Sequence, residues 1–199
     1  MDIIGNRNIG WLLEKKAGDF ADKDFIVFED RAGTVLRYTY REFNEQVDKY
    51  ATVLHTLGIK KDDKVNVHLL NSPEFLFSWF ALAKLGAVMI PTNVLCAPFE
   101  MEYFVDFADC VAVITEPAYM DMYRAILDKC PRVKHTIVVR TSPLYPNQKL
   151  YPGATIMQDV LKDTVAALPR VAVDSEDDLM MLFTSGTTSR PKAVQLTHA

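Results

Sequence analysis

The chain has 199 residues, with 22 basic and 26 acidic side chains and a formal charge of −4 at pH 7. It has no basic runs, which argues against nucleic-acid binding because such proteins cluster Lys and Arg to neutralise phosphates. Three cysteines without a CxxC pair predict free thiols in a reducing cytoplasm, and neither a zinc site nor a disulfide framework. The N-terminus shows no signal-peptide pattern, and the longest apolar stretch is too short to span a membrane.

A β-hairpin and a long amphipathic helix are the first predicted elements. Residues 24–30 and 34–38 are β-type runs on either side of a turn that contains glycine, which predicts the hairpin. A helix is expected to start at Thr39, whose hydroxyl caps it while Glu42 completes a capping box. Gly58 is expected to end this helix.

Strand and helix patterns then alternate along the chain. Strands are predicted over residues 64–70, 87–91, 110–115 and 134–140, and helices over residues 74–85, 99–107 and 118–129. This alternation is typical of parallel strands joined by crossover helices. The predicted fold class is α/β, with a mostly parallel sheet flanked by helices and a small N-terminal hairpin.

The last third of the chain is expected to contain a proline-rich loop at 141–153, a short helix at 155–165 and an apolar strand at 179–183. Acidic residues at positions 174, 176, 177 and 178 precede that strand. They suggest either a cation site or a solvated boundary, and the boundary is the simpler interpretation because acidic groups without a basic partner favour water.

The segment from Thr184 to Lys192, TSGTTSRPK, carries the clearest chemical pattern, and we call it the signature segment. Glycine lets a backbone approach a ligand closely, hydroxyl and backbone N–H groups bind anions, and the lysine adds a positive charge. The pattern therefore predicts phosphate binding, with an exposed turn between two strands as the alternative.

Other known motifs fit this segment poorly. The Walker A spacing fails at Pro191, and neither GxGxxG nor GxSxG occurs in the chain. Ser189 to Lys192 match the SxxK of serine β-lactamases, but that motif lies on a helix and has SDN and KTG companions that are missing here.

TSGTTSRPK resembles the phosphate-binding signature of the adenylate-forming superfamily, which includes acyl-CoA synthetases, peptide-synthetase adenylation domains and beetle luciferases. The segments RYTYREFNEQV, LGIKKDDKV and NSPEFLFSWFALAKLGAVMIPTN are also similar to that superfamily. The resemblance implies that residues 1–199 form the N-terminal portion of an AMP-binding domain. The remainder of the domain and a C-terminal lid domain would lie downstream.

The resemblance also implies an activity, that of an ATP-dependent acid–CoA ligase. A carboxylate would attack the α-phosphorus of Mg-ATP, and the thiol of coenzyme A would then take the acyl group, so ATP, Mg²⁺ and coenzyme A are expected. The residues expected to hold the β- and γ-phosphates are Thr184, Ser185, Gly186, Thr187, Thr188, Ser189 and Lys192. No catalytic residue is expected within these 199 residues, which are predicted to be inactive alone.

Finer features resemble one subgroup, the betaine–CoA ligases. The opening MDIIG, the run from His68 to Asn93 and the Ser189-Arg190 pair imply carnitine, crotonobetaine or γ-butyrobetaine as the acid. A ligase for another acid, a carrier-loading adenylation domain and a non-catalytic phosphate-binding module remain alternatives, and homo-oligomerisation is left open.

Four further residues carry expectations of their own. Ala193 stands where the family usually has glycine, which predicts strain if the position needs a positive φ and none if it is extended. His68 is expected to be a hydrogen-bonded core residue, and Trp79 to pack in the core. His198 is expected either near the nucleotide or at the surface.

Overall fold

The computed structural model describes residue 5 and residues 7–141, 153–168, 170–184 and 191–199. The described helices are α1 (Ile9–Asp19), α2 (Tyr40–Thr56), α3 (Pro73–Leu85), α4 (Pro98–Phe107), α5 (Met120–Ile126) and α6 (Met157–Leu161). The strands are β1 (Asp24–Glu29), β2 (Val35–Thr39), β3 (Lys64–His68), β4 (Val88–Pro91), β5 (Ala112–Thr115), β6 (His135–Val138), β7 (Ala154–Ile156), β8 (Asp178–Thr184) and β9 (Lys192–Thr197).

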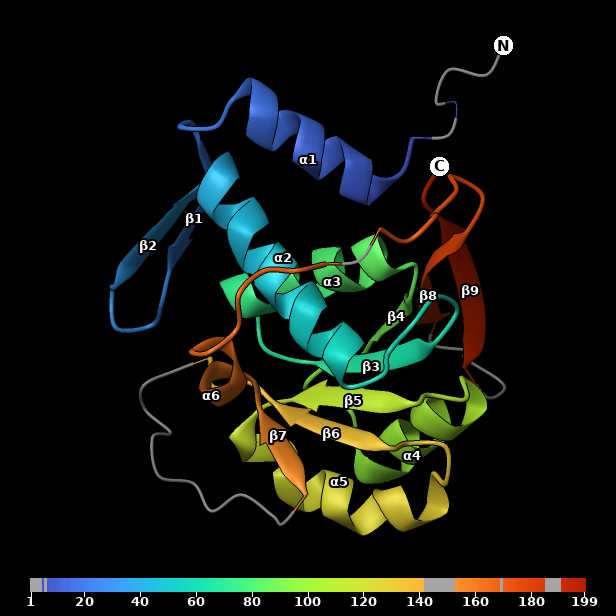
Figure 1. The fold of residues 1–199 in the computed structure, drawn as a ribbon. Coiled ribbons are helices and arrows are strands. Elements are labelled where there is room, and N and C mark those ends of the chain that lie inside the picture. Colours follow the sequence, from blue (N-terminus) through green and yellow to red (C-terminus); the bar gives the residue numbers. More distant parts are fainter. Residues whose placement is uncertain (1–4, 6, 142–152, 169, 185–190) are drawn as a thin grey trace.

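Seven of these strands form one sheet in the order β7-β6-β5-β3-β4-β8-β9, and β1 and β2 form a separate antiparallel hairpin (Figure 1). All neighbours in the larger sheet are parallel except β8 and β9, which are antiparallel. The predicted fold class, a mostly parallel sheet flanked by helices with a small N-terminal hairpin, is confirmed.

The two longest helices start and end where local chemistry dictates. Thr39 accepts a hydrogen bond from the Glu42 amide, and the Glu42 carboxylate accepts one from the Thr39 amide, so the predicted capping box is present. Ser72 caps α3 with Pro73 in its first turn, and Gly86 ends it with a φ of 66°. A Cβ at Gly86 would also lie 3.1 Å from a methyl carbon of Val173, so a side chain here would strain the backbone and crowd Val173.

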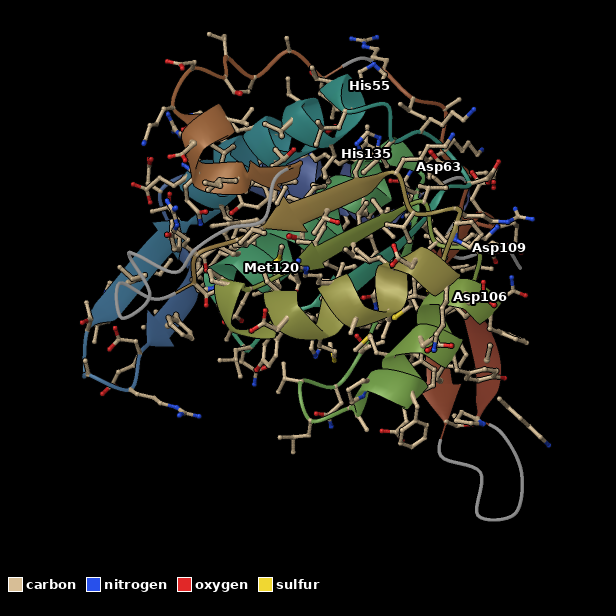
Figure 2. The ribbon with its side chains drawn as sticks, turned by 90° about the horizontal axis from the view of Figure 1, so that it is seen from below. His55, Asp63, Asp106, Asp109, Met120 and His135 are labelled. Atoms are coloured by element: carbon tan, nitrogen blue, oxygen red, sulfur yellow. The ribbon has the colours of Figure 1, made fainter. Side chains whose placement is uncertain are left out.

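Helices cover both faces of the sheet. The first layer consists of α1, α2 and α3, and its core includes Phe43, Val47 and Phe77. The second layer consists of α4 and α5; Figure 2, seen from below, shows them over the sheet, with Met120 at the start of α5 and Asp106 near the end of α4. Trp79 packs against the first core, as the sequence predicts.

Three local predictions need correction. Helix α1 was not predicted, because only Gly10 and Leu13 of its residues are buried and its apolar periodicity is therefore weak. The helix expected at 155–165 begins as strand β7, whose three residues pair with β6. The helix expected at 118–129 consists of α5 between two short 3₁₀ segments, Pro117–Tyr119 and Leu127–Lys129.

In the part of the chain that the structure describes, no helix is both long enough and apolar enough to cross a membrane.

Candidate phosphate-binding site

The signature segment starts at the carboxyl edge of the parallel sheet. Strands β3, β4, β5, β6 and β8 all run in one direction, so their carboxyl ends share one edge, and Thr184 ends β8. The amino edge is marked in Figure 2 by the labelled Asp63, Asp109 and His135. Ligands of open α/β sheets bind outside the carboxyl ends of the strands.

Two of the predicted phosphate-binding residues face each other across the end of the β8–β9 hairpin. Thr184 is paired with Lys192 in the antiparallel register, and the Thr184 hydroxyl donates to the Lys192 carbonyl oxygen at 3.4 Å. Both residues are exposed. No carboxylate among the described residues forms an ion pair with the Lys192 ammonium. The hairpin thus presents a hydroxyl and an ammonium group together at the start and end of the segment.

Outside the described residues lie the other predicted site residues, Ser185, Gly186, Thr187, Thr188 and Ser189, together with Arg190. Their assignment to the phosphates of ATP therefore stays a prediction.

Ala193 shows no sign of the strain that one interpretation predicted. It lies within β9, is paired with Phe183, and is not among the described non-glycine residues with a positive φ, which are Asp62 and Asp109. Its methyl group packs against the core formed by α4 and α5. The extended alternative is correct, and the methyl group fits this backbone.

Helix α4 contacts strand β8 and the residue that precedes β9, and sequence reasoning missed both contacts. The Tyr103 hydroxyl donates to the Pro191 carbonyl oxygen at 3.2 Å. The Phe104 ring lies 4.4 Å from the Phe183 ring, centroid to centroid. These partners are separated by about 80 to 90 residues of sequence, so no local pattern could have paired them.

A second group of polar side chains lies at the carboxyl edge between β3 and β5. Strand β3 lies between β4 and β5, so the chain crosses over β3 on its way from β4 to β5, which makes this a topological switch point. The Glu116 carboxylate accepts a hydrogen bond from the Leu70 amide at 2.6 Å. His68 beside it is fully buried, with its ring 4.4 Å from that of Tyr119.

His68 is a core residue, as predicted, but the expected hydrogen bonds are not fully formed. Neither ring nitrogen has a partner with full hydrogen-bond geometry among the described residues. Burial lowers the pKa of His68 to about 4, and the nearby backbone of Asn93 and Val94 opposes only part of that shift. The ring is therefore neutral at pH 7.

The acidic residues before β8 form a capped turn. The Asp177 carboxylate accepts from the Asp174 amide at 2.7 Å and forms an ion pair with Lys61, which lowers the pKa of Asp177. The predicted boundary is correct in place, since β8 starts at Asp178, but Asp177 does have a basic partner. No group of three or more potential metal ligands occurs among the described residues.

His198 lies at the far end of β9 from the signature segment. It is buried, its backbone amide donates to the Asp177 carbonyl at 3.2 Å, and burial lowers the pKa of its ring. The rise per residue of a strand puts it about 20 Å from Lys192. The surface interpretation of His198 is wrong, because the side chain is buried, and a position near the nucleotide stays a prediction.

A cavity of about 500 Å³ lies toward the amino edge of the sheet, beside the end of α3 and the segment before β8. Its lining includes Glu14, Asp48, Lys84 and Val173. Val173 lies near Gly86, two residues before β4 starts, so the cavity lies away from the edge where the signature segment begins.

Comparison with known proteins agrees with this architecture. A crotonobetaine/carnitine–CoA ligase of Salmonella agona (strain SL483) is 35% identical over all 199 residues, and the chain spans 38% of that relative's length. The crystal structure of the anthranilate CoA ligase AuaEII in complex with anthranoyl-AMP matches 99% of the chain and 36% of its own, with a TM-score of 0.86 and 23% identity. The inhibitor-bound N-terminal domain of FACL13 from Mycobacterium tuberculosis matches 96% of the chain and 44% of its own, with a TM-score of 0.80 and 29% identity.

The two solved structures share the fold of almost the whole chain. The family model described as "AMP-binding enzyme" matches residues 13–199, a span that includes the sheet, helices α2 to α6 and the signature segment. The chain belongs to the AMP-binding enzyme family.

Proposed function

We propose that this chain is the N-terminal portion of an ATP-dependent acid–CoA ligase. The enzyme activates a carboxylate as an acyl-adenylate and then transfers the acyl group to coenzyme A. The observation that carries the proposal is the position of the signature segment, which leaves the carboxyl edge of a parallel sheet in a member of the AMP-binding family.

In this proposal, the signature segment holds the β- and γ-phosphates of ATP. Thr184 contributes a hydroxyl group and Lys192 a positive charge from the two sides of the hairpin. Hydroxyl and amide donors come from the residues between them, Ser185, Gly186, Thr187, Thr188 and Ser189. Transfer of an adenylyl group depends mainly on positioning and charge neutralisation, which such donors provide. Mg²⁺ enters with ATP and neutralises further phosphate charge.

The acid substrate is proposed to be carnitine, crotonobetaine or γ-butyrobetaine. Support comes from the 35% identity with a crotonobetaine/carnitine–CoA ligase over the whole chain. A ligase for another acid and a carrier-loading adenylation domain are the alternatives, and the choice of acid and thiol distinguishes them.

ATP–pyrophosphate exchange in the complete protein tests the role of the signature segment. Replacing Lys192→Ala removes a charge-assisted contact to phosphate, and we expect the KM for ATP to rise about ten- to hundredfold. Lys192→Arg keeps the charge and should recover part of that loss. The control is Lys162→Ala, which removes an exposed ammonium that pairs with Asp159.

The same assay tests the acid. Exchange is measured with the three betaines, with fatty acids and without acid, and product formation is followed with coenzyme A. Exchange with fatty acids alone would contradict the betaine assignment. If none of the acids supports exchange and the isolated chain binds ATP saturably, a non-catalytic phosphate-binding module would be favoured.

The proposal places the overall reaction in the longer protein, because the chain spans 38% of the length of the relative named above. We propose that the 199 residues alone do not form acyl-CoA. We also place the enzyme in the cytoplasm, where Cys96, Cys110 and Cys130, all free in the structure, would stay reduced.

A further inference from the structure

Helix α4 contacts both sides of the β8–β9 hairpin where the signature segment begins and ends. Phe183 directly precedes Thr184, and its ring lies 4.4 Å from Phe104 and 5.9 Å from Phe107. Just before β9, the Tyr103 hydroxyl donates to the Pro191 carbonyl at 3.2 Å. Figure 2 shows α4 lying beside this hairpin. One face of one helix therefore contacts both sides of the predicted phosphate site.

The hydrogen bond from Tyr103 reaches the chain where the sheet no longer holds it. The last pair of the β8–β9 register is Thr184 with Lys192, so Pro191 lies one residue beyond the ladder. Proline has no backbone N–H, and its carbonyl group is the remaining backbone hydrogen-bonding group. Tyr103 binds that carbonyl and so fixes the peptide that joins Pro191 to Lys192.

We propose that Tyr103 is a positioning residue for the ATP-binding step: it orients the backbone of Lys192 and thereby the ammonium group that meets the phosphates. This inference rests on the proposed function of the signature segment. Binding is strongest when such groups are held in place before the ligand arrives, because less ordering is then required on binding. Tyr103 itself need not touch ATP.

The test is Tyr103→Phe in the complete protein, which removes the hydroxyl and leaves the ring packed on Phe183. The bond is between neutral groups, so we expect its loss to raise the KM for ATP about three- to tenfold in ATP–pyrophosphate exchange. The KM for the acid and the melting temperature should stay unchanged. Tyr40→Phe is the matched control, since Tyr40 lies in α2 and stacks on Phe25.

A double-mutant cycle separates positioning from simple support of the fold. If Tyr103 acts through Lys192, Tyr103→Phe should raise the KM for ATP little further in protein that already carries Lys192→Ala. If the two residues act independently, their effects on the KM for ATP multiply. Multiplied effects, or an unchanged KM for ATP in Tyr103→Phe, would overturn the inference. If Tyr103→Phe fails to fold, Phe104→Leu loosens the same helix from Phe183 and must raise the KM for ATP.

Failure of the proposed function gives a different result. Wild-type protein would then show no exchange with any acid, or Lys192→Ala would retain the wild-type KM for ATP. Either result removes the role of the signature segment itself, and with it the premise on which the role of Tyr103 rests.

Discussion

His68 brings a titratable ring into the centre of the protein. Its backbone belongs to β3, where Val65 and Val67 face the first helical layer and His68 faces the second, against the rings of Tyr119 and Tyr123. The ring is fully buried and has no fully formed hydrogen bond among the described residues. A charged imidazole without a partner is costly in such surroundings, which is why burial lowers the pKa to about 4.

This pKa makes stability depend on pH in a known direction. Between pH 6.5 and pH 4 the unfolded chain binds a proton at His68 and the folded chain does not, so stability falls as the pH is lowered through this window. Linkage gives a loss of about 2 kcal/mol between pH 7 and pH 5 from this ring. Urea unfolding at both pH values should show a smaller difference for His68→Gln than for wild type.

The controls for this measurement are simple. His55→Gln removes an exposed imidazole from α2 and controls for the loss of a histidine as such. An equal pH dependence in wild type and His68→Gln would show that His68 binds a proton as readily in the folded protein as in the unfolded chain, contrary to the prediction.

At the scale of elements, Lys84 joins three helices. It lies in α3, and its ammonium donates to Glu14 of α1 at 3.0 Å, to Asp48 of α2 at 2.6 Å and to Asn44 of α2 at 2.9 Å. The Lys84 side chain is 3% exposed, compared with 27% for Asp48. The three donors of the ammonium are thus used, and the first helical layer is fixed by a polar contact as well as by its core.

Replacing Lys84→Met should therefore destabilise the protein more than an exposed ion pair would. The change leaves the partly buried Asp48 without its cation, and we expect the free energy of unfolding to fall by about 2–3 kcal/mol. The matched variant is Lys129→Met, whose ammonium is 64% exposed and pairs with Glu102 at 2.8 Å. That change should cost less than about 1 kcal/mol by urea unfolding. Equal losses would show that burial adds nothing to the Lys84 contacts.

The elements also show which parts of the fold local sequence determines. Thr39, Glu42, Pro73 and Gly86 act within one or two helical turns, so the starts and ends of α2 and α3 were predictable. Strand β7 has three residues and exists because it pairs with β6. Its sequence alone therefore predicted a helix.

The residues of the candidate site also fall into those that a local motif predicts and those that only packing brings together. Thr184 and Lys192 were identified from a continuous motif, and the register of β8 and β9 brings them together. Tyr103 and the partners of Lys84 come from distant positions and meet only through packing of α4 and of the first helical layer. Such contacts leave no periodic trace in the sequence.

The molecule as a whole consists of two apolar cores separated by one sheet. The central strands β4 and β5 contribute to both cores. Met89 and Ala112 pack in the first core, and Val88 and Val113 pack in the second. A sheet shared in this way couples the two layers, because opening either one exposes residues of the same strands. We therefore expect the described chain to unfold as one cooperative unit.

The cysteines can report this unfolding. Cys110 and Cys130 are buried in the second core, where burial raises their pKa values to about 12 and about 11; Cys96 is half-buried and its pKa is raised as well. Thiolates are the species that react with disulfide reagents, so the raised pKa of Cys110 and its burial both slow its labelling. In native buffer at pH 8, Cys96 should be labelled first. Labelling of Cys110 and Cys130 should speed up together with increasing urea, in parallel with the loss of circular dichroism.

Mass spectrometry identifies each site, and Cys96→Ser should remove only the first phase. Labelling of Cys130 at urea concentrations that leave Cys110 protected would mean that α4 and α5 open separately from the sheet, and that the two cores are not one cooperative unit.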